Sequence, residues 1–418
     1  MIYGLELNGI KACITACLYP LFYYIALKSN NNKFKYLITL LFLILGIYFE
    51  NRTSIICISL IFIFFHKQRI FKLNKWVLLL SFFILTYIII FIKFDSVIGR
   101  LYIWKVIFSN IHHVPFFGFG LDSFKLNYAQ WQSNYFAANL DWDKFHSLAD
   151  CPSFAFNELL HFYTEFGFIS ILFFSVILYF NITLLLKYKT SIVAYMASIN
   201  LVIFLFCMVS YSLHSIWILL LFLSNHFAIA SFIYKPIKIL CISSITLLLV
   251  TGITFFIKYK KTESLWLYAQ FIPEVNSSEK ANSYKEVFSS LSTNQLFLDD
   301  YCNYLLSDSL TDNVIVITST HSKYFNQYEK NILLGKAYLQ KSDFSKSLAA
   351  FKKANFIIPN RFIPLAYLMK IFLLNKDTSN AVEYAKKIIK MPIKVNSNTI
   401  DRIKHEAFLT IDFTKKHL

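Results

Sequence analysis

Residues 167–186 read GFISILFFSVILYFNITLLL, an uninterrupted apolar block that carries no charged side chain. A helix needs about twenty apolar residues to cross the hydrocarbon core of a bilayer. The apolar residues are continuous instead of alternating with polar ones, which is not the pattern of a half-buried strand. The block therefore predicts a membrane-spanning helix.

Similar blocks recur through the first part of the chain. They lie at about 9–27, 35–49, 54–66, 76–93, 167–186, 192–213, 215–234 and 238–257. Hydrophobic residues make up 56% of the 418 residues and the mean hydropathy is +0.51, which excludes an ordinary soluble protein. We expect an all-α protein in which residues 1–258 form a polytopic bundle of about eight membrane helices.

The segment 36–65 is interrupted by Glu50-Asn51-Arg52 and fits one long helix or two short ones. Basic loop residues decide between them, because they gather on the cytoplasmic side of a membrane. Two helices place the basic run 66–75 and the loop lysines on one side: Lys28, Lys33, Lys35, Lys187, Lys189, Lys235 and Lys238. Two helices therefore predict that Arg52, the large loop 94–166 and everything after residue 258 are periplasmic.

Charge and cysteine content exclude other classes of protein. The formal net charge is +17, which in a soluble protein would suggest a nucleic-acid partner. Here much of the excess lies in short loops between apolar blocks, so we expect no nucleic-acid partner. The seven cysteines show no CxxC and no Cys/His ligand spacing, so no metal site is predicted.

The composition changes at about residue 262, and we expect a soluble helical domain over 262–418. Six residues stand at positions 7, 8, 11, 24, 27 and 32 of a 34-residue tetratricopeptide unit: Leu334, Gly335, Tyr338, Phe351, Ala354 and Pro359. This repeat covers 328–361, and a second, less faithful one covers 362–395. Gly335 lets the paired helix approach, and Phe351 packs back onto it. Such repeats stack into a concave binding face for a protein partner, whereas a generic helical tail is the alternative.

Two arginines stand at the predicted periplasmic face. Arg52 lies between two apolar runs, where an arginine costs a few kcal/mol unless it faces water or an anion; a simple interfacial turn is the alternative. Arg100 precedes Trp104 by four residues, so a helix places both on one face with the indole at the headgroup level. Two guanidinium groups at one membrane face suit a pyrophosphate, because they bind phosphate oxygens in a bidentate manner.

The large loop holds two further candidate groups. Residues 115–120, Pro-Phe-Phe-Gly-Phe-Gly, predict a tight turn in which Gly118 and Gly120 let backbone amides approach a ligand. Further along the loop is a set of polar residues that we expect to lie at the mouth of the membrane, where a base for a sugar hydroxyl would be needed. This set consists of His146, Asp150, Asn157, Glu158, His161 and Glu165. His214 and His226 are interpreted as interfacial or packed residues.

Taken in order, these segments resemble the O-antigen ligase and polymerase superfamily, the kind with a periplasmic tetratricopeptide tail, over most of the chain. Asn51-Arg52-Thr53 is similar to the family's Ser-Arg at the outer start of a span. Arg100-Leu-Tyr-Ile-Trp104 with residues 115–120 is similar to its Arg-x-x-x-Trp followed by Pro-x-x-Gly-x-Gly. Residues 156–160 with Glu165-Phe-Gly resemble its His-Asn-x-aromatic-Leu with a downstream Glu-x-Gly.

The resemblance implies a multi-pass enzyme of the bacterial inner membrane that needs no cofactor and no metal. Arg52 and Arg100 would hold the pyrophosphate of an undecaprenyl-linked glycan, and the large loop would position the acceptor. Trp104, Gly118, Gly120, Asn157 and Glu165 are expected to bind substrate. An acceptor hydroxyl, on a lipid A core, a glycan chain or a protein Ser/Thr, would attack the anomeric carbon with inversion while the lipid pyrophosphate leaves.

The chain departs from the family pattern in two ways. Phe156 stands at the position of the family's loop histidine, so Glu158, His161 or Asp150 would act as the base, or the arginines alone would suffice. Family members usually have roughly a dozen spans, so we expect this chain to be N-terminally shortened. The competing interpretations are a non-catalytic scaffold, a polysaccharide transporter and an inactive truncated ligase.

Overall fold

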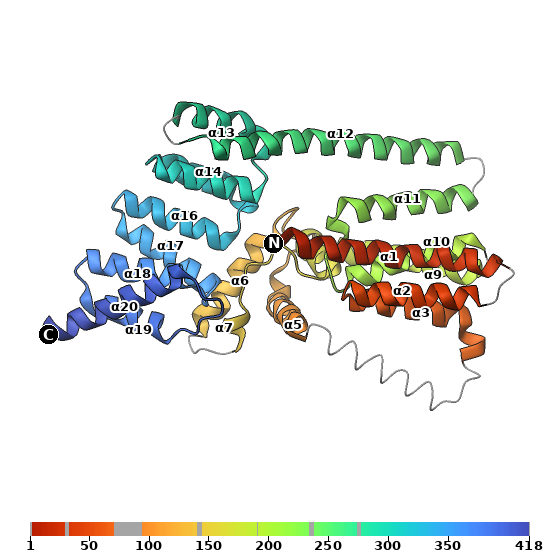
Figure 1. The fold of residues 1–418 in the computed structure, drawn as a ribbon, viewed down its shortest axis with the longest axis horizontal. Coiled ribbons are helices and arrows are strands. Elements are labelled where there is room, and N and C mark those ends of the chain that lie inside the picture. Colours follow the sequence, from red (N-terminus) through yellow and green to blue (C-terminus); the bar gives the residue numbers. More distant parts are fainter. Residues whose placement is uncertain are drawn as a thin grey trace. The chain divides into compact units, whose positions relative to one another are not determined.

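The computed structural model describes residues 2–29, 33–70, 94–139, 144–189, 191–233, 238–273 and 277–417. The regular structure of this part of the chain is entirely helical, which confirms the all-α prediction (Figure 1). The chain forms two compact units. The first comprises Met1–Leu101, Val114–Gly120 and Phe154–Phe255, and the second comprises Tyr102–His113, Leu121–Ser153 and Phe256–Leu418.

The first unit is a bundle of apolar helices. Its elements are α1 (Ile2–Lys28), α2 (Phe34–Tyr48), α3 (Arg52–Ile70), the start of α5 (Phe94–Ser109), α8 (Glu158–Phe166), α9 (Phe168–Lys187), α10 (Ile192–Cys207), η2 (Ser212–His214), α11 (Ile216–Ile233) and the first part of α12 (Lys238–Phe271). Within the described residues, three segments are long and apolar enough to cross a membrane: Asn8–Lys28, Phe168–Lys187 and Ile216–Ile233. The predicted span 76–93 lies outside the described residues.

The helix boundaries settle two sequence predictions. The segment 36–65 forms two helices, because α2 ends at Tyr48 and α3 begins at Arg52. Glu50 takes a positive φ of 48° in the turn between them. The predicted span 192–213 was too long, since α10 ends at Cys207 and a separate 3₁₀ turn follows at Ser212–His214.

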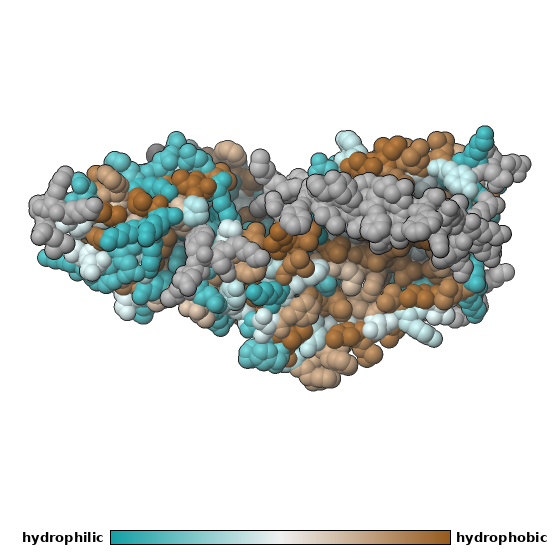
Figure 2. All heavy atoms as spheres, turned by 90° about the horizontal axis from the view of Figure 1, so that it is seen from below, coloured by the Kyte–Doolittle hydropathy of each residue, from teal (hydrophilic) through white to brown (hydrophobic). Residues whose placement is uncertain are grey.

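Large apolar side chains lie both inside the bundle and on its outer surface. Buried residues of α1, α2, α3 and α10 pack together, among them Tyr23, Phe42, Ile58 and Ile203. On α9, by contrast, Leu172 and other large apolar side chains are exposed. Figure 2 shows hydrophobic side chains gathered over this bundle on the face in view. A bundle that is apolar on both sides is suited to lipid, so the chain is a membrane protein.

Contacts define the two ends of the bundle. At one end the hydroxyl of Tyr23 lies 2.7 Å from Nδ1 of His66, near the lysines that end α1 and begin α2. At the other end the Ser54 hydroxyl donates to the carbonyl of Ala12 at 3.0 Å. Arg52 therefore lies at the end opposite these lysines, as the two-helix prediction requires.

A polar network joins three of the apolar helices. Asn200 on α10 donates to Oδ1 of Asn181 on α9 at 2.9 Å. Its own Oδ1 accepts from Asn225 on α11 at 2.8 Å, and Nε2 of His226 lies 3.2 Å from its amide. All three asparagines are buried. Amide groups in apolar surroundings hold helices together, because separating them leaves their hydrogen bonds unsatisfied.

We expect Asn200→Leu to destabilise the bundle by about 1–2 kcal/mol, since Asn181 and Asn225 then lose their shared partner. The measurement is the unfolding temperature of the purified chain in detergent. Thr183→Leu is the matched control, because the exposed Thr183 hydroxyl bonds, within the described part of the chain, only to Tyr179 of its own helix. Equal unfolding temperatures for the two variants would contradict this role of the network.

The second unit is built largely from paired helices. It contains η1 (Ile111–His113), α6 (Phe124–Ala138), α7 (Lys144–Leu148), the end of α12, α13 (Ser277–Leu291), α14 (Gln295–Ser307), α15 (Thr311–Thr320), η5 (Ser322–Tyr324), α16 (Gln327–Gln340), α17 (Phe344–Ile357), α18 (Phe362–Leu374), α19 (Thr378–Lys390) and α20 (Asn398–His417). A Cβ at Gly335 would lie only 2.6 Å from the ring of Phe351, so the close approach predicted at this glycine is confirmed. The tetratricopeptide assignment itself stays a prediction.

Part of the large loop belongs with these helices. Gln132 of α6 donates to the carbonyl of Ile357 at 2.6 Å, and Asn360 donates to the carbonyl of His146 at 2.8 Å. Ala129 and Cys151 share a buried cluster with Phe351 and other residues of α16, α17 and α18. This arrangement differs from the predicted division, which placed all of 94–166 in the membrane domain.

Candidate active site

Two arginines lie at the same end of the helix bundle. Arg52 is the first residue of α3, and Arg100 lies in α5. Nη1 of Arg100 donates to the carbonyl of Val209 at 2.5 Å, and its guanidinium carbon lies 5.3 Å from the centre of the Phe156 ring. Burial lowers the pKa of Arg100, and the nearby charge of Arg52 lowers that pKa further. The two cations are thus close enough to repel each other.

Arg100 has spare hydrogen-bonding capacity. Among the described residues, Arg100 makes no ion pair with a carboxylate, and its Nε is buried without a hydrogen-bond partner. An arginine remains protonated in proteins, so the repulsion is not relieved by loss of a proton. An anion with several oxygens relieves it, because each guanidinium presents a fork of donors.

Asn157 positions the chain beside Arg100. It caps α8 by accepting from the backbone N–H of Leu160 at 3.0 Å, and its Nδ2 donates to the carbonyl of Met208 at 2.9 Å. An N-cap of this type stabilises a helix start by about 1 kcal/mol. Both ends of this side chain are therefore engaged within the protein, although the sequence predicted it to bind substrate.

Glu158 forms a carboxylate–imidazole pair with a residue that the sequence analysis did not select. Glu158 is fully buried and accepts from the backbone N–H of Leu213 at 2.7 Å. The same oxygen, Oε1, lies 3.3 Å from Nδ1 of His214, and Oε2 lies 3.1 Å from that nitrogen. The His214 side chain is 25% exposed. The sequence interpretation of His214 as interfacial or packed missed this pair. Its position between two predicted spans, on the same face as Arg52, was the available signal.

A second carboxylate–imidazole pair adjoins the first. Nε2 of His161 lies 3.5 Å from Oε1 of Glu165, and the His161 and His214 rings meet edge to face at 4.6 Å. His161 and Glu165 are only 4% and 2% exposed. Phe154 also contacts both imidazoles. His214 is therefore the more accessible of the two histidines.

The glycine turn packs against the junction of α8 and α9. Gly118 has a φ of +73°, and a Cβ there would lie 2.2 Å from the carbonyl oxygen of Glu165. The backbone N–H of Gly118 donates to Pro115 at 2.9 Å, and that of Gly120 donates to Glu165 at 2.9 Å. Both N–H groups therefore donate hydrogen bonds to carbonyls of the chain itself, which corrects the expectation that they approach a ligand.

The remaining predicted residues belong to the second unit. Trp104 is partly buried on α5, one turn after Arg100. Asp150 is exposed, accepts from the backbone N–H of Cys151 at 2.9 Å, and lies near Lys394. Asp150 is therefore not among the residues that the first unit gathers around the arginines.

The site combines two arginines with buried carboxylate–imidazole pairs at one end of an apolar helix bundle. Residues 21–175 match the family model described as O-antigen ligase, a range that includes both arginines, the glycine turn and α8. This match supports the O-antigen ligase superfamily and, with it, a membrane protein of glycan assembly. No curated protein and no solved structure matches the chain.

Proposed function

We propose that this protein transfers a glycan from a polyprenyl pyrophosphate, of the undecaprenyl type, to an acceptor hydroxyl at the periplasmic face of the inner membrane. The position of Arg52 and Arg100 at the same end of the bundle is the observation that carries this proposal, and the charge of Arg52 is close enough to lower the pKa of Arg100. A pyrophosphate supplies the several anionic oxygens that two adjacent guanidinium groups need. The lysines at the opposite end of the bundle support the orientation, because basic loops stay in the cytoplasm. The acceptor is a lipid A core, a glycan chain or a protein Ser/Thr.

The reaction is an inverting displacement at the anomeric carbon. The acceptor oxygen forms a bond to that carbon while the bond from the carbon to the pyrophosphate oxygen breaks. The electron pair of the broken bond stays on the leaving pyrophosphate, where Arg52 and Arg100 stabilise the developing negative charge. Preorganised donors of this kind act without rearranging during the reaction.

His214 is the proposed acceptor of the hydroxyl proton. Glu158 faces its Nδ1, so the proton of the neutral ring resides on Nδ1 and the lone pair on Nε2. Carboxylate–imidazole pairs of this kind orient a general base. Phe156, at the position of the family's loop histidine, cannot accept a proton and instead covers the Arg100 guanidinium.

We expect His214→Ala to slow glycan transfer by about 100-fold or more, which is the usual contribution of a general base. The measurement is the transfer rate of the purified chain with saturating donor and acceptor, across a pH series. His113→Ala is the control, because His113 is an exposed residue of η1 in the second unit. A rate and pH profile equal to those of the wild type would eliminate His214 as the base.

A further inference from the structure

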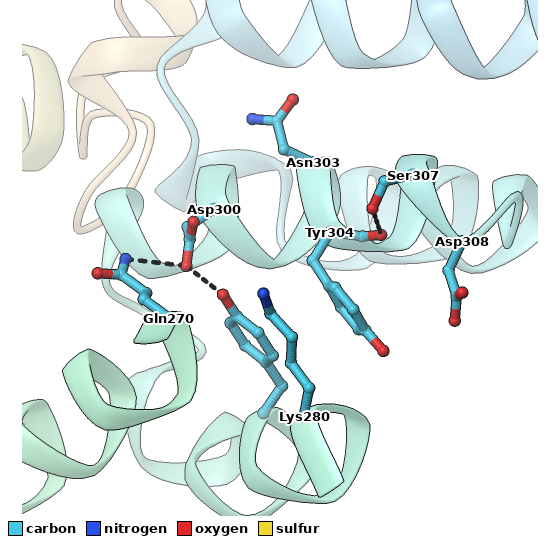
Figure 3. Close-up of a pocket in the computed structure, with 8 residues that line it drawn as sticks. Gln270, Lys280, Asp300, Asn303, Tyr304, Ser307 and Asp308 are labelled. Carbon is cyan, nitrogen blue, oxygen red and sulfur yellow. Dashed lines mark hydrogen bonds between the residues drawn. The ribbon is translucent and has the colours of Figure 1, made fainter. Parts of the chain in front are cut away.

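A cavity of about 450 Å³ lies within the second unit, formed by the end of α12 with α13 and α14 (Figure 3). Its volume falls in the range of small-molecule binding sites, roughly 300–1,000 Å³. Most of the lining side chains are polar or charged, and they include Gln270, Lys280, Asp300, Asn303 and Asp308. Tyr284 and Tyr304 supply aromatic surface beside them. None of these residues takes part in the site around the arginines.

Asp300 is held rigidly in this cavity. Its Oδ2 accepts hydrogen bonds from Nε1 of Trp266 at 2.8 Å, from Nε2 of Gln270 at 3.0 Å and from the hydroxyl of Tyr284 at 2.6 Å. Trp266 and Tyr284 are only 7% and 2% exposed. The other oxygen, Oδ1, accepts no hydrogen bond from the described residues. Asp300 therefore offers one acceptor in a fixed direction, with its orientation already determined by the protein.

Lys280 supplies a donor opposite this acceptor. Figure 3 shows its ammonium group pointing toward the space between Asp300 and Tyr304. Nζ of Lys280 lies 5.8 Å from the centre of the Tyr304 ring and makes no ion pair with the described carboxylates. The Tyr284 and Tyr304 rings are stacked, with their centres 5.0 Å apart and an angle of 11° between their planes.

The mixture of charges selects a class of ligand. Asp300 and Asp308 disfavour an anion, whereas Lys280 disfavours a simple cation. A metal ion is a poor fit, since three donors already occupy Oδ2 and no cluster of three metal ligands occurs in the described part of the chain. Neutral hydroxyl groups fit, because each donates one hydrogen bond and accepts others. Two adjacent hydroxyls can donate to Asp300 and accept from Lys280, while the apolar face of a sugar ring contacts tyrosine.

We propose that this cavity binds a neutral sugar unit. The role of this site rests on the proposed function, since the donor and the acceptor of a glycan-transferring protein both contain sugar units. The second unit then holds part of a glycan chain through contacts that are independent of the pyrophosphate. Binding measured without lipid donor or acceptor tests this cavity separately from the transfer reaction.

The experiment is calorimetric titration of the full-length chain in detergent with the methyl glycosides of glucose, galactose, N-acetylglucosamine and N-acetylgalactosamine. At least one glycoside is expected to bind with a millimolar dissociation constant and to change the emission of Trp266, which bonds directly to Asp300. Lys280→Met is expected to weaken binding about tenfold, because a charge-assisted hydrogen bond is lost. Lys285→Met, an exposed lysine on the same helix, is the matched control and binds like the wild type.

The possible outcomes separate clearly. Binding of inorganic phosphate in preference to every glycoside, or no glycoside binding at all, overturns the proposal. Equal binding by the Lys280→Met and Lys285→Met variants overturns it as well, because binding is then located elsewhere. A chain that lacks transfer activity but binds a glycoside through Lys280 contradicts the proposed function and supports the cavity.

Discussion

Replacing Arg100 with alanine is expected to lower glycan transfer by about 100- to 1,000-fold, the usual loss when one preorganised donor to a developing negative charge is removed. Arg100 has a buried Nε that is not used within the described protein, and it lies beside a second cation. Its removal leaves Arg52 to stabilise the leaving pyrophosphate alone. The measurement is the surface glycan ladder on a gel, in a strain that lacks the native copy, together with the transfer rate of the purified variant.

Two further variants sharpen this test. Arg100→Lys keeps the charge but loses the planar fork of donors, so an activity between those of the wild type and the alanine variant is expected. Arg402→Ala removes an exposed arginine that lies near Glu406 on α20, and serves as the control. If the two site arginines grip one ligand, the effects of Arg52→Ala and Arg100→Ala will not add. A normal ladder from Arg100→Ala at wild-type protein levels would refute the proposed donor site.

Replacing Gly118 with alanine is expected to destabilise the first unit by about 3 kcal/mol or more, which places it among the severe single substitutions. The new Cβ would lie 2.2 Å from the carbonyl oxygen of Glu165, and the φ of +73° is itself unfavourable for alanine. The obstructing atom belongs to the backbone, so rotation of a side chain does not relieve the clash. The measurement is the yield and unfolding temperature of the purified variant in detergent.

Gly9→Ala is the matched control, because nothing lies within 4 Å of its added Cβ on α1. A glycine-to-alanine change inside a helix is stabilising by about 0.5–1 kcal/mol. The two substitutions are chemically identical, so a difference between them reports the packing of the turn against the junction of α8 and α9. A Gly118→Ala protein as stable as the wild type would show that this packing is wrong.

Several features of the fold were predictable because they depend on neighbouring residues. The interruption at Glu50-Asn51-Arg52, together with loop charge, predicted the division between α2 and α3. The repeat pattern placed Gly335 against Phe351, and the structure has that contact. Helix boundaries were less predictable, since α10 stops at Cys207 although apolar residues continue beyond it.

The partners of the polar site residues were not predictable in the same way. Glu158 was selected as a base candidate, but its partner His214 comes from a turn more than fifty residues later. The sequence predicted that the backbone amides of Gly118 and Gly120 approach a ligand. In the structure these N–H groups donate hydrogen bonds to the carbonyls of Pro115 and Glu165. Asp150 was grouped with Glu158 by proximity in sequence, but it belongs to the other unit.

Long uncharged blocks by themselves determined that this protein is helical and membrane-embedded, because a backbone in lipid must satisfy its own hydrogen bonds within each helix. The sequence also determined which end of the bundle carries Arg52, since the basic loop residues gather on one side of the membrane and Arg52 lies on the other. Only the tertiary structure decided that Arg100 bonds to Val209 and that Glu158 faces His214. Those pairings are set by how separate helices pack, and packing joins residues that no local pattern connects.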